Sequence, residues 1–128
     1  MRKILLMLPL VIASGNALAE WVKIGGNEAD TLYVDPVTII KSAHKVKMQT
    51  LHDYKTALKA AGDGFMSTVV QEEYDCQKNQ ARTLYFSCHS KNLGKGRKVY
   101  SETDSHQWEP VRPGSAREAL WKFACKKK

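Results

Sequence analysis

The sequence FMSTVVQEEYDC at residues 65–76 is followed, across the polar stretch QKNQA (77–81), by RTLYFSCHS at residues 82–90. Apolar and polar side chains alternate in both segments, which predicts two antiparallel strands with one buried face and one solvated face. The predicted buried face carries Met66, Val70, Tyr74, Cys76, Leu84, Phe86 and Cys88. Glu72 breaks the pattern, which indicates a sheet edge or a β-bulge.

Four further strands are predicted outward from this hairpin, at residues 21–24, 31–34, 44–54 and 97–101. Asp35 followed by Pro36 is typical of a helix N-cap with proline in the first turn, which predicts one helical turn through Ile40. We expect residues 56–64 to form a turn or loop, since Gly62-Asp63-Gly64 lies within them.

A helix is predicted after the proline-rich connection at residues 110–114. Ser115 and Glu118 have the spacing of a capping box. One helical stripe then carries Ala116, Leu120, Phe123 and Ala124. The sequence therefore predicts an α+β fold, in which a C-terminal α-helix packs on an antiparallel β-sheet of about six strands.

The first residues have the pattern of a secretory signal peptide. Arg2 and Lys3 precede an apolar run, and Ala17-Leu18-Ala19 is a small-x-small cleavage site. We therefore expect a signal peptide at residues 1–19, cleavage after Ala19, and a single domain at residues 20–128. No apolar run is long enough for a membrane-spanning helix, and no cysteine at the cleavage site could carry a lipid anchor. The protein is thus expected to be periplasmic or secreted.

The expected mature chain contains three cysteines, and an oxidising compartment favours a disulfide between two of them. If the hairpin places Cys76 opposite Arg82, Cys76 and Cys88 lie about 20 Å apart along the strands. That distance excludes a bond between them, because a disulfide needs Cα atoms within about 7 Å. The residues alone leave two pairings open, Cys76–Cys125 and Cys88–Cys125.

The sequence contains no recognisable catalytic or cofactor motif. The histidines His44, His52, His89 and His106 are scattered without metal-ligand spacing, so we predict no metal site and no cofactor. Adjacent Cys88 and His89 point to opposite faces of a strand, which argues against a nucleophile–base pair. A basic cluster is the one candidate partner-binding surface, formed by Lys91, Lys95, Arg97 and Lys98. Export makes a nucleic-acid partner improbable despite the formal charge of +7.

An ordered set of short segments runs through nearly the whole expected mature chain: AEWVK (19–23), YVDPVTI (33–39), DYK (53–55), EYDC (73–76), VRPGS (111–115) and LWKFAC (120–125). Together they resemble the surface-adhesin protein E family of Gram-negative bacteria. The resemblance implies an antiparallel sheet with a packed helix, and a disulfide between Cys76 and Cys125. The namesake of the family is a surface lipoprotein that binds host matrix proteins, whereas this sequence lacks the lipidation cysteine.

The resemblance predicts an exported, non-enzymatic binding module with a protein partner among host matrix or envelope proteins. One alternative is a periplasmic inhibitor of a hydrolase, since small disulfide-bonded exported proteins often have that role. A second alternative, from a different class, is an enzyme with no recognisable motif.

Overall fold

The structure, a computed structural model, describes residues 20–127, so the predicted signal peptide at residues 1–19 lies outside the described part of the chain. The elements in chain order are β1 (Val22–Gly26), β2 (Asp30–Ser42), β3 (Lys45–Ala60), β4 (Asp63–Asp75), β5 (Gln80–His89), the 3-10 turn η1 (Asn92–Gly94), β6 (Lys98–Glu102), β7 (Glu109–Pro110) and α1 (Ala116–Cys125). Strands β1 to β6 pair in that order in one antiparallel sheet, and β7 also pairs with β5. This confirms the predicted fold class.

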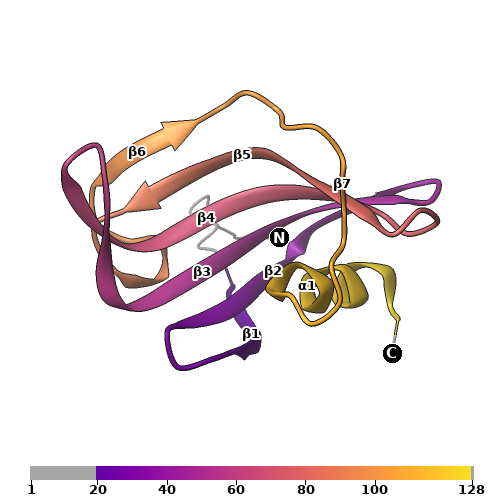
Figure 1. Ribbon diagram of the computed structural model, residues 1–128, viewed down its shortest axis with the longest axis horizontal. Coiled ribbons are helices and arrows are strands. Elements are labelled where there is room, and N and C mark those ends of the chain that lie inside the picture. The colour runs from indigo at the N-terminus through magenta and orange to yellow at the C-terminus, as the bar shows by residue number, and fades with distance from the viewer. Residues whose placement is uncertain (1–19, 128) are drawn as a thin grey trace, which may run out of the picture.

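The two faces of the sheet have different neighbours. Helix α1 lies against one of them, which we call the helix face (Figure 1). Paired residues point to the same side of a sheet, so the helix face includes the row Val34, Thr50, Val70, Phe86 and Glu102. The opposite side, the outer face, includes the row Tyr33, Leu51, Val69, Ser87 and Ser101. The main apolar core lies between the helix face and α1, with Val34, Met48, Tyr74, Leu120 and Trp121 as members.

The prediction that one face of the hairpin is solvated is wrong for β4. Glu73 and Asp75 on its outer face are buried, as are Tyr74 and Glu72 on its helix face. β4 lies between β3 and β5, and side chains of its neighbours cover this end of its outer face. Arg82 of β5 pairs with Glu73 at 2.9 Å, and Trp108 lies against both Arg82 and Lys45 of β3. Alternation in the sequence shows which side chains share a face, but not whether a second layer covers the polar face.

The predicted register of the β4–β5 hairpin is also wrong. Asp75 pairs with Gln80, so the turn is residues 76–79, and Arg82 lies opposite Glu73 rather than Cys76. The turn closes early because the Asp75 carboxylate accepts the backbone N–H groups of Gln77 and Lys78, both at 3.0 Å. A β-bulge at Leu84 then moves Thr83 to the helix face, opposite Glu72.

The helical turn predicted after Asp35 does not form, because β2 continues through this segment as a bulged strand. The side chain of Asp35 does accept the N–H of Val37, at 3.2 Å, but as a local turn within the strand. The Thr38 hydroxyl bridges the bulge: it donates to the Asp35 carbonyl and accepts the N–H of Gln49 on the neighbouring strand. The register moves from Asp35 opposite Gln49 to Ile40 opposite Lys47, and Pro36 is tolerated in the bulge.

The loop predicted at residues 56–64 is mostly strand. β3 continues to Ala60 and β4 begins at Asp63, so that only Ala61 and Gly62 connect them. Both connecting residues have positive φ, 53° and 86°, as a tight hairpin turn requires.

Helix α1 begins where the capping-box pattern predicts it. The Ser115 hydroxyl accepts the N–H of Glu118, and the Glu118 carboxylate accepts the N–H of Gly114 rather than that of Ser115. Leu120 and Ala124 are buried as predicted, but Ala116 and Phe123 are exposed. Trp121 is buried in their place, because its indole N–H donates to the Asp75 carbonyl at 3.1 Å and turns that side of the helix toward β4.

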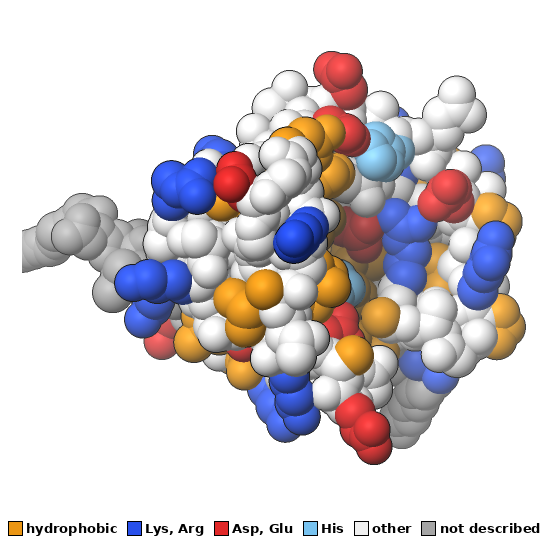
Figure 2. All heavy atoms as spheres, turned by 60° about the vertical axis from the view of Figure 1, so that its left-hand side comes forward, with side chains coloured by type: hydrophobic (Ala, Val, Ile, Leu, Met, Phe, Trp, Pro, Cys, Tyr) orange, Lys and Arg blue, Asp and Glu red, His pale blue; other side chains and the backbone are white. Residues whose placement is uncertain are grey.

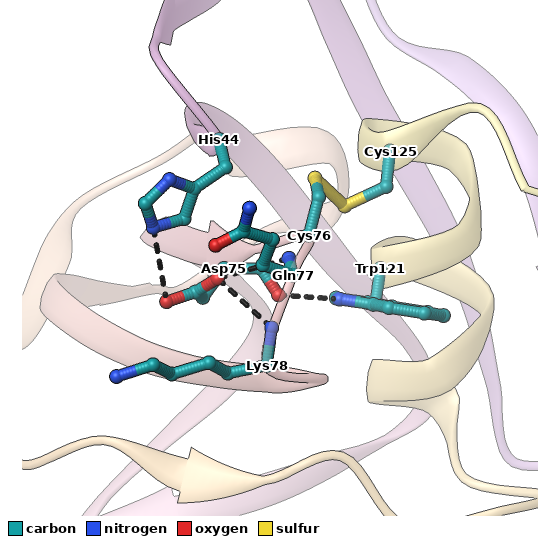
Figure 3. Close-up of a disulfide and its surroundings, with 7 residues drawn as sticks. All are labelled: His44, Asp75, Cys76, Gln77, Lys78, Trp121 and Cys125. Carbon is teal, nitrogen blue, oxygen red and sulfur yellow. Dashed lines mark hydrogen bonds and ion pairs between the residues drawn. A yellow bond between two sulfur atoms is a disulfide. The ribbon is translucent and has the colours of Figure 1, made fainter.

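A disulfide fixes the end of α1 to the end of β4. Cys76 and Cys125 are bonded, with their Cα atoms 5.5 Å apart, which is the pairing that the family resemblance implies. Figure 3 shows the disulfide beside the Trp121–Asp75 hydrogen bond, and we call these four residues the helix junction. Burial alone would raise the pKa of Asp75, but the N–H groups of Lys78 and Gln77 and the nearby His44 and Lys45 outweigh it and lower that pKa. Cys88 is buried and free.

Removal of the disulfide should destabilise the protein strongly. The bond joins residues 49 positions apart, so a chain-entropy argument predicts that Cys76→Ala/Cys125→Ala lowers the free energy of unfolding by about 4 kcal/mol. Urea unfolding followed by circular dichroism measures this change. Wild-type protein reduced with dithiothreitol is the matched control and should unfold at nearly the same urea concentration as the variant; an unchanged midpoint in both would contradict the prediction.

Candidate functional site

The four predicted partner-binding cations lie together on one loop. Lys91, Lys95, Arg97 and Lys98 lie between β5 and the start of β6, and all four side chains are exposed. We call residues 90–98 the basic loop. It folds back over the outer face of the sheet, and η1 contacts β3 and β4.

Polar side chains of the sheet hold the basic loop in place. The Asp53 carboxylate accepts the N–H of Leu93 at 2.8 Å and the side-chain amide of Asn92 at 3.1 Å. The Ser67 hydroxyl donates to the Lys91 carbonyl at 2.6 Å and accepts the N–H of Gly94 at 2.9 Å. Asp53 and Ser67 are paired across β3 and β4, so both anchors belong to the central part of the sheet. The loop is therefore a preformed surface rather than a loosely attached tip.

Gly94 is required at the point where the loop touches the sheet. Its φ of +72° is unfavourable for residues with a side chain, and a Cβ there would lie 3.1 Å from Cγ2 of Val69. The close backbone approach explains the Gly94-Lys95-Gly96 sequence, which on its own resembles a simple hairpin tip.

The cations of the basic loop are exposed and form few ion pairs with the rest of the described chain. Arg97 lies 4.0 Å from the Asp63 carboxylate, but both side chains are exposed and such a pair contributes little. Among residues 20–127, the other three cations of the loop form no ion pair within 4.0 Å. The loop thus carries a concentrated positive charge that nearby carboxylates do not neutralise.

An adjacent hollow adds aromatic side chains to this charge. A cavity of about 720 Å³ on the outer face, the outer hollow, is lined by residues that include Trp21, Tyr85, His89, Lys95 and Lys98. Tyr85 is 42% exposed, and burial together with the charge of Lys98 lowers the pKa of His89. Sequence reasoning identified the lysines and missed these aromatic neighbours. The alternation of β5 does place Tyr85, Ser87 and His89 on one face, which is the signal that could have found two of them.

On the helix face, Glu72 is the centre of a hydrogen-bonded network. Its carboxylate accepts the hydroxyls of Tyr74 at 2.8 Å and Thr83 at 3.0 Å, and the Arg117 guanidinium at 2.7 Å. Arg117 also donates to Glu109 at 2.9 Å. Burial would lower the pKa of Arg117, but Glu72 and Glu109 raise it overall, whereas burial and Glu72 both raise the pKa of Tyr74. The residue that breaks the sequence pattern therefore binds α1 to the sheet, and we call this pair the Glu72–Arg117 clamp.

The histidines do not converge on a metal site. His52 lies 3.2 Å from the Asp30 carboxylate, His106 lies 2.8 Å from Glu102 and His44 lies 3.7 Å from Asp75. Within the described residues, no group of three or more His, Cys, Asp and Glu side chains is placed to hold a metal ion. Cys88 and His89 lie on opposite faces of β5, and burial raises the pKa of the Cys88 thiol.

Comparisons with known proteins agree with this architecture. The family model described as "Surface-adhesin protein E" matches residues 21–126. Crystal form II of Haemophilus influenzae protein E has a similar fold, with a TM-score of 0.69 and 11% sequence identity over 88% of this chain and 92% of that chain. A second structure of the same protein gives a TM-score of 0.65 and 11% identity over 90% of each chain. A search of curated protein sequences finds no match. No helix within residues 20–127 has the length and apolar character needed to cross a membrane.

The clamp gives a direct mutational prediction. Arg117→Met leaves the Glu72 carboxylate buried without its cation, so we expect the free energy of unfolding to fall by about 3 kcal/mol. The double variant Glu72→Gln/Arg117→Met removes both charges and should be more stable than Arg117→Met alone. Glu109→Gln is the control, because Glu109 is exposed and should change stability by no more than about 0.5 kcal/mol. Equal stability of Arg117→Met and wild type in urea unfolding would show that the clamp is not structural.

Proposed function

Because this chain belongs to the surface-adhesin protein E family, we propose that it is an exported, adhesin-like protein that binds another protein and does not catalyse a reaction. The proposed mature domain is residues 20–128, released by cleavage after Ala19. The proposed partner is a host matrix protein or an envelope protein, and the proposed contact surface is the basic loop with the outer hollow beside it.

The main support for this proposal is that hydrogen bonds to the sheet hold the basic loop in one conformation. A loop that Asp53 and Ser67 already hold in one conformation loses little entropy when it binds. Its exposed cations attract an acidic surface over several ångströms and orient it before contact. Trp21 and Tyr85 then provide apolar area beside the charges, and aromatic side chains of this kind carry much of the affinity in protein interfaces.

Export is the first part of the proposal to test. Expression in a Gram-negative host, fractionation of the periplasm and medium, and intact-mass measurement should give a product that begins at Glu20. A full-length product confined to the cytoplasm would contradict the proposed export. Residues 20–128 expressed without residues 1–19 provide the mass standard.

The proposed binding surface can be tested after a pull-down has identified a partner protein. A pull-down with the mature protein against matrix proteins and envelope extracts should retain an acidic protein. In surface plasmon resonance, Lys95→Ser/Arg97→Ser/Lys98→Ser should lower the association rate about tenfold at low salt and flatten its salt dependence, while the dissociation rate changes less. These exposed substitutions should change the free energy of unfolding by no more than about 0.5 kcal/mol each.

A second triple variant controls for net charge. Lys41→Ser/Lys47→Ser/Lys78→Ser removes the same charge at exposed positions near the opposite end of the strands. It should associate with the partner much faster than the basic-loop variant does. Equal association rates for the two variants would mean that overall charge matters and that the basic loop is not the contact surface.

A further inference from the structure

The helix face holds a second cavity, separate from the outer hollow, which we call the inner cavity. Its volume is about 530 Å³. Side chains of β3, β4 and β5 form its floor, and the first turns of α1 with the segment before β7 form its roof; the lining includes His52, Tyr54, Thr68, Val70, Glu72, Thr83, Phe86, His106, Arg117 and Leu120. Figure 2 shows a hollow with acidic and histidine side chains inside it and at its rim.

The middle of the inner cavity is apolar. Val70 and Phe86 are paired across β4 and β5 on the floor, and Leu120 of α1 faces them from the roof. A cavity of this volume, with apolar walls and a few polar groups, has the usual size and character of a small-molecule site in proteins. The occupant must therefore have an apolar body that can replace water against these three side chains.

The charged groups around the inner cavity are mostly carboxylates. Glu72 lines it, and two lining histidines each contact a carboxylate, His52 with Asp30 and His106 with Glu102. Arg117 is the one Lys or Arg among the lining residues, and its ion pair with Glu72 offsets the charge of that carboxylate. The remaining carboxylates, those of Asp30, Glu102 and Glu109, lie behind the lining, and each contacts a lining residue. The cavity thus has a net negative surrounding in a chain whose formal charge is +7, whereas Lys95 and Lys98 line the outer hollow.

Aromatic rings and hydrogen-bond acceptors complete a cation-binding environment. Tyr54 and Phe86 line the cavity; Tyr54 forms a T-shaped pair with Phe65, with ring centroids 5.8 Å apart, and Phe86 packs against Tyr100 at 5.9 Å. Ring faces attract organic cations. Nδ1 of His52 lies 3.2 Å from the Asp30 carboxylate, and in the neutral ring that donates from Nδ1 to this carboxylate, Nε2 is an acceptor. Such groups can accept N–H donors from an ammonium, and a carboxylate ligand would meet repulsion here.

We propose that the inner cavity binds a small organic amine, with a protonated ammonium group on an apolar body of aromatic size. The apolar body lies between Val70, Phe86 and Leu120. The ammonium group lies at the end of the cavity that carries His52 and Asp30. The amine makes no covalent bond, and the site is independent of the protein-binding surface proposed on the outer face.

Three probes of nearly the same shape test the role of charge. 2-Phenylethylamine, 2-phenylethanol and 3-phenylpropanoate are titrated into the disulfide-bonded mature protein, and amide chemical shifts are followed by NMR. The amine should bind about tenfold more tightly than the neutral alcohol, and the carboxylate should bind more weakly than either. Amide shifts should change at Val70, Phe86 and Leu120 and stay constant at Tyr85 and Lys95. Equal affinity for all three probes, no binding of the amine at millimolar concentration, or shifts confined to the outer face would overturn the proposal.

Substitution of two carboxylates beside the inner cavity, with one control, tests which of them attracts the ammonium group. Asp30→Asn should weaken binding of the amine by about three- to tenfold, because Asp30 lies at the end proposed for the ammonium group. Glu102→Gln, across the cavity with three strands between Glu102 and Asp30, should weaken it less, and both variants should keep the affinity for 2-phenylethanol. Asp63→Asn is the matched control, because it removes an exposed carboxylate beside Arg97, away from the cavity. Thermal unfolding of each variant checks that the fold is retained. Amine affinity that is the same in Asp30→Asn, Glu102→Gln and wild type would contradict the proposed site.

Discussion

The covalent and hydrogen-bonded attachment of α1 to the end of β4 is the constraint on which the rest of this structure depends. The disulfide fixes the distance between Cys76 and Cys125, and the Trp121–Asp75 hydrogen bond fixes the rotation of the helix about its axis. Once both are set, Leu120 and Ala124 face the core and Arg117 reaches the buried carboxylate of Glu72. Helix α1 has ten residues, and an isolated helix of this length has little stability in water. Its stability therefore depends on its attachment to the sheet.

The attachment also separates two chemically different surfaces. β4 is one of the two central strands, and α1 packs on one side of it. On the other side the basic loop covers the part near Ser67 and Val69. Ser67 and Asp53 hold the basic loop on the outer face, and Glu72 with Arg117 holds the helix on the inner one. In this way polar side chains of β3 and β4 position both the basic loop on the outer face and the helix that roofs the inner cavity. A small domain thereby gains two surfaces that suit ligands of opposite charge.

The sequence predicted what depends on local pattern and missed what depends on a second layer. The hairpin strands, the Ser115 cap and the presence of one C-terminal helix follow from alternation, capping chemistry and helical spacing. The hairpin register could not be predicted, because the Asp75 turn and the Leu84 bulge both shift it. Glu72, which breaks the alternation, indicated a sheet edge or a bulge at this level but not that the extra residue lies on β5. Phe123 and Trp121 are both plausible core residues on the helix, and only contact with β4 decides between them. The four cations were found because they are close in sequence, whereas the inner cavity draws residues from distant segments and could not be predicted.

Hydrogen exchange measured by NMR on the oxidised and the reduced protein tests the role of the helix junction most directly. If the junction holds α1 on the sheet, reduction of the Cys76–Cys125 bond should lower the protection of the Leu120 and Ala124 amides about 100-fold or more relative to those of Thr50 and Val70 in the central strands. That result would show that the helix opens first while the sheet remains paired. An equal loss of protection in helix and sheet, or no loss in the helix, would contradict the account, because α1 would then keep its place without the junction.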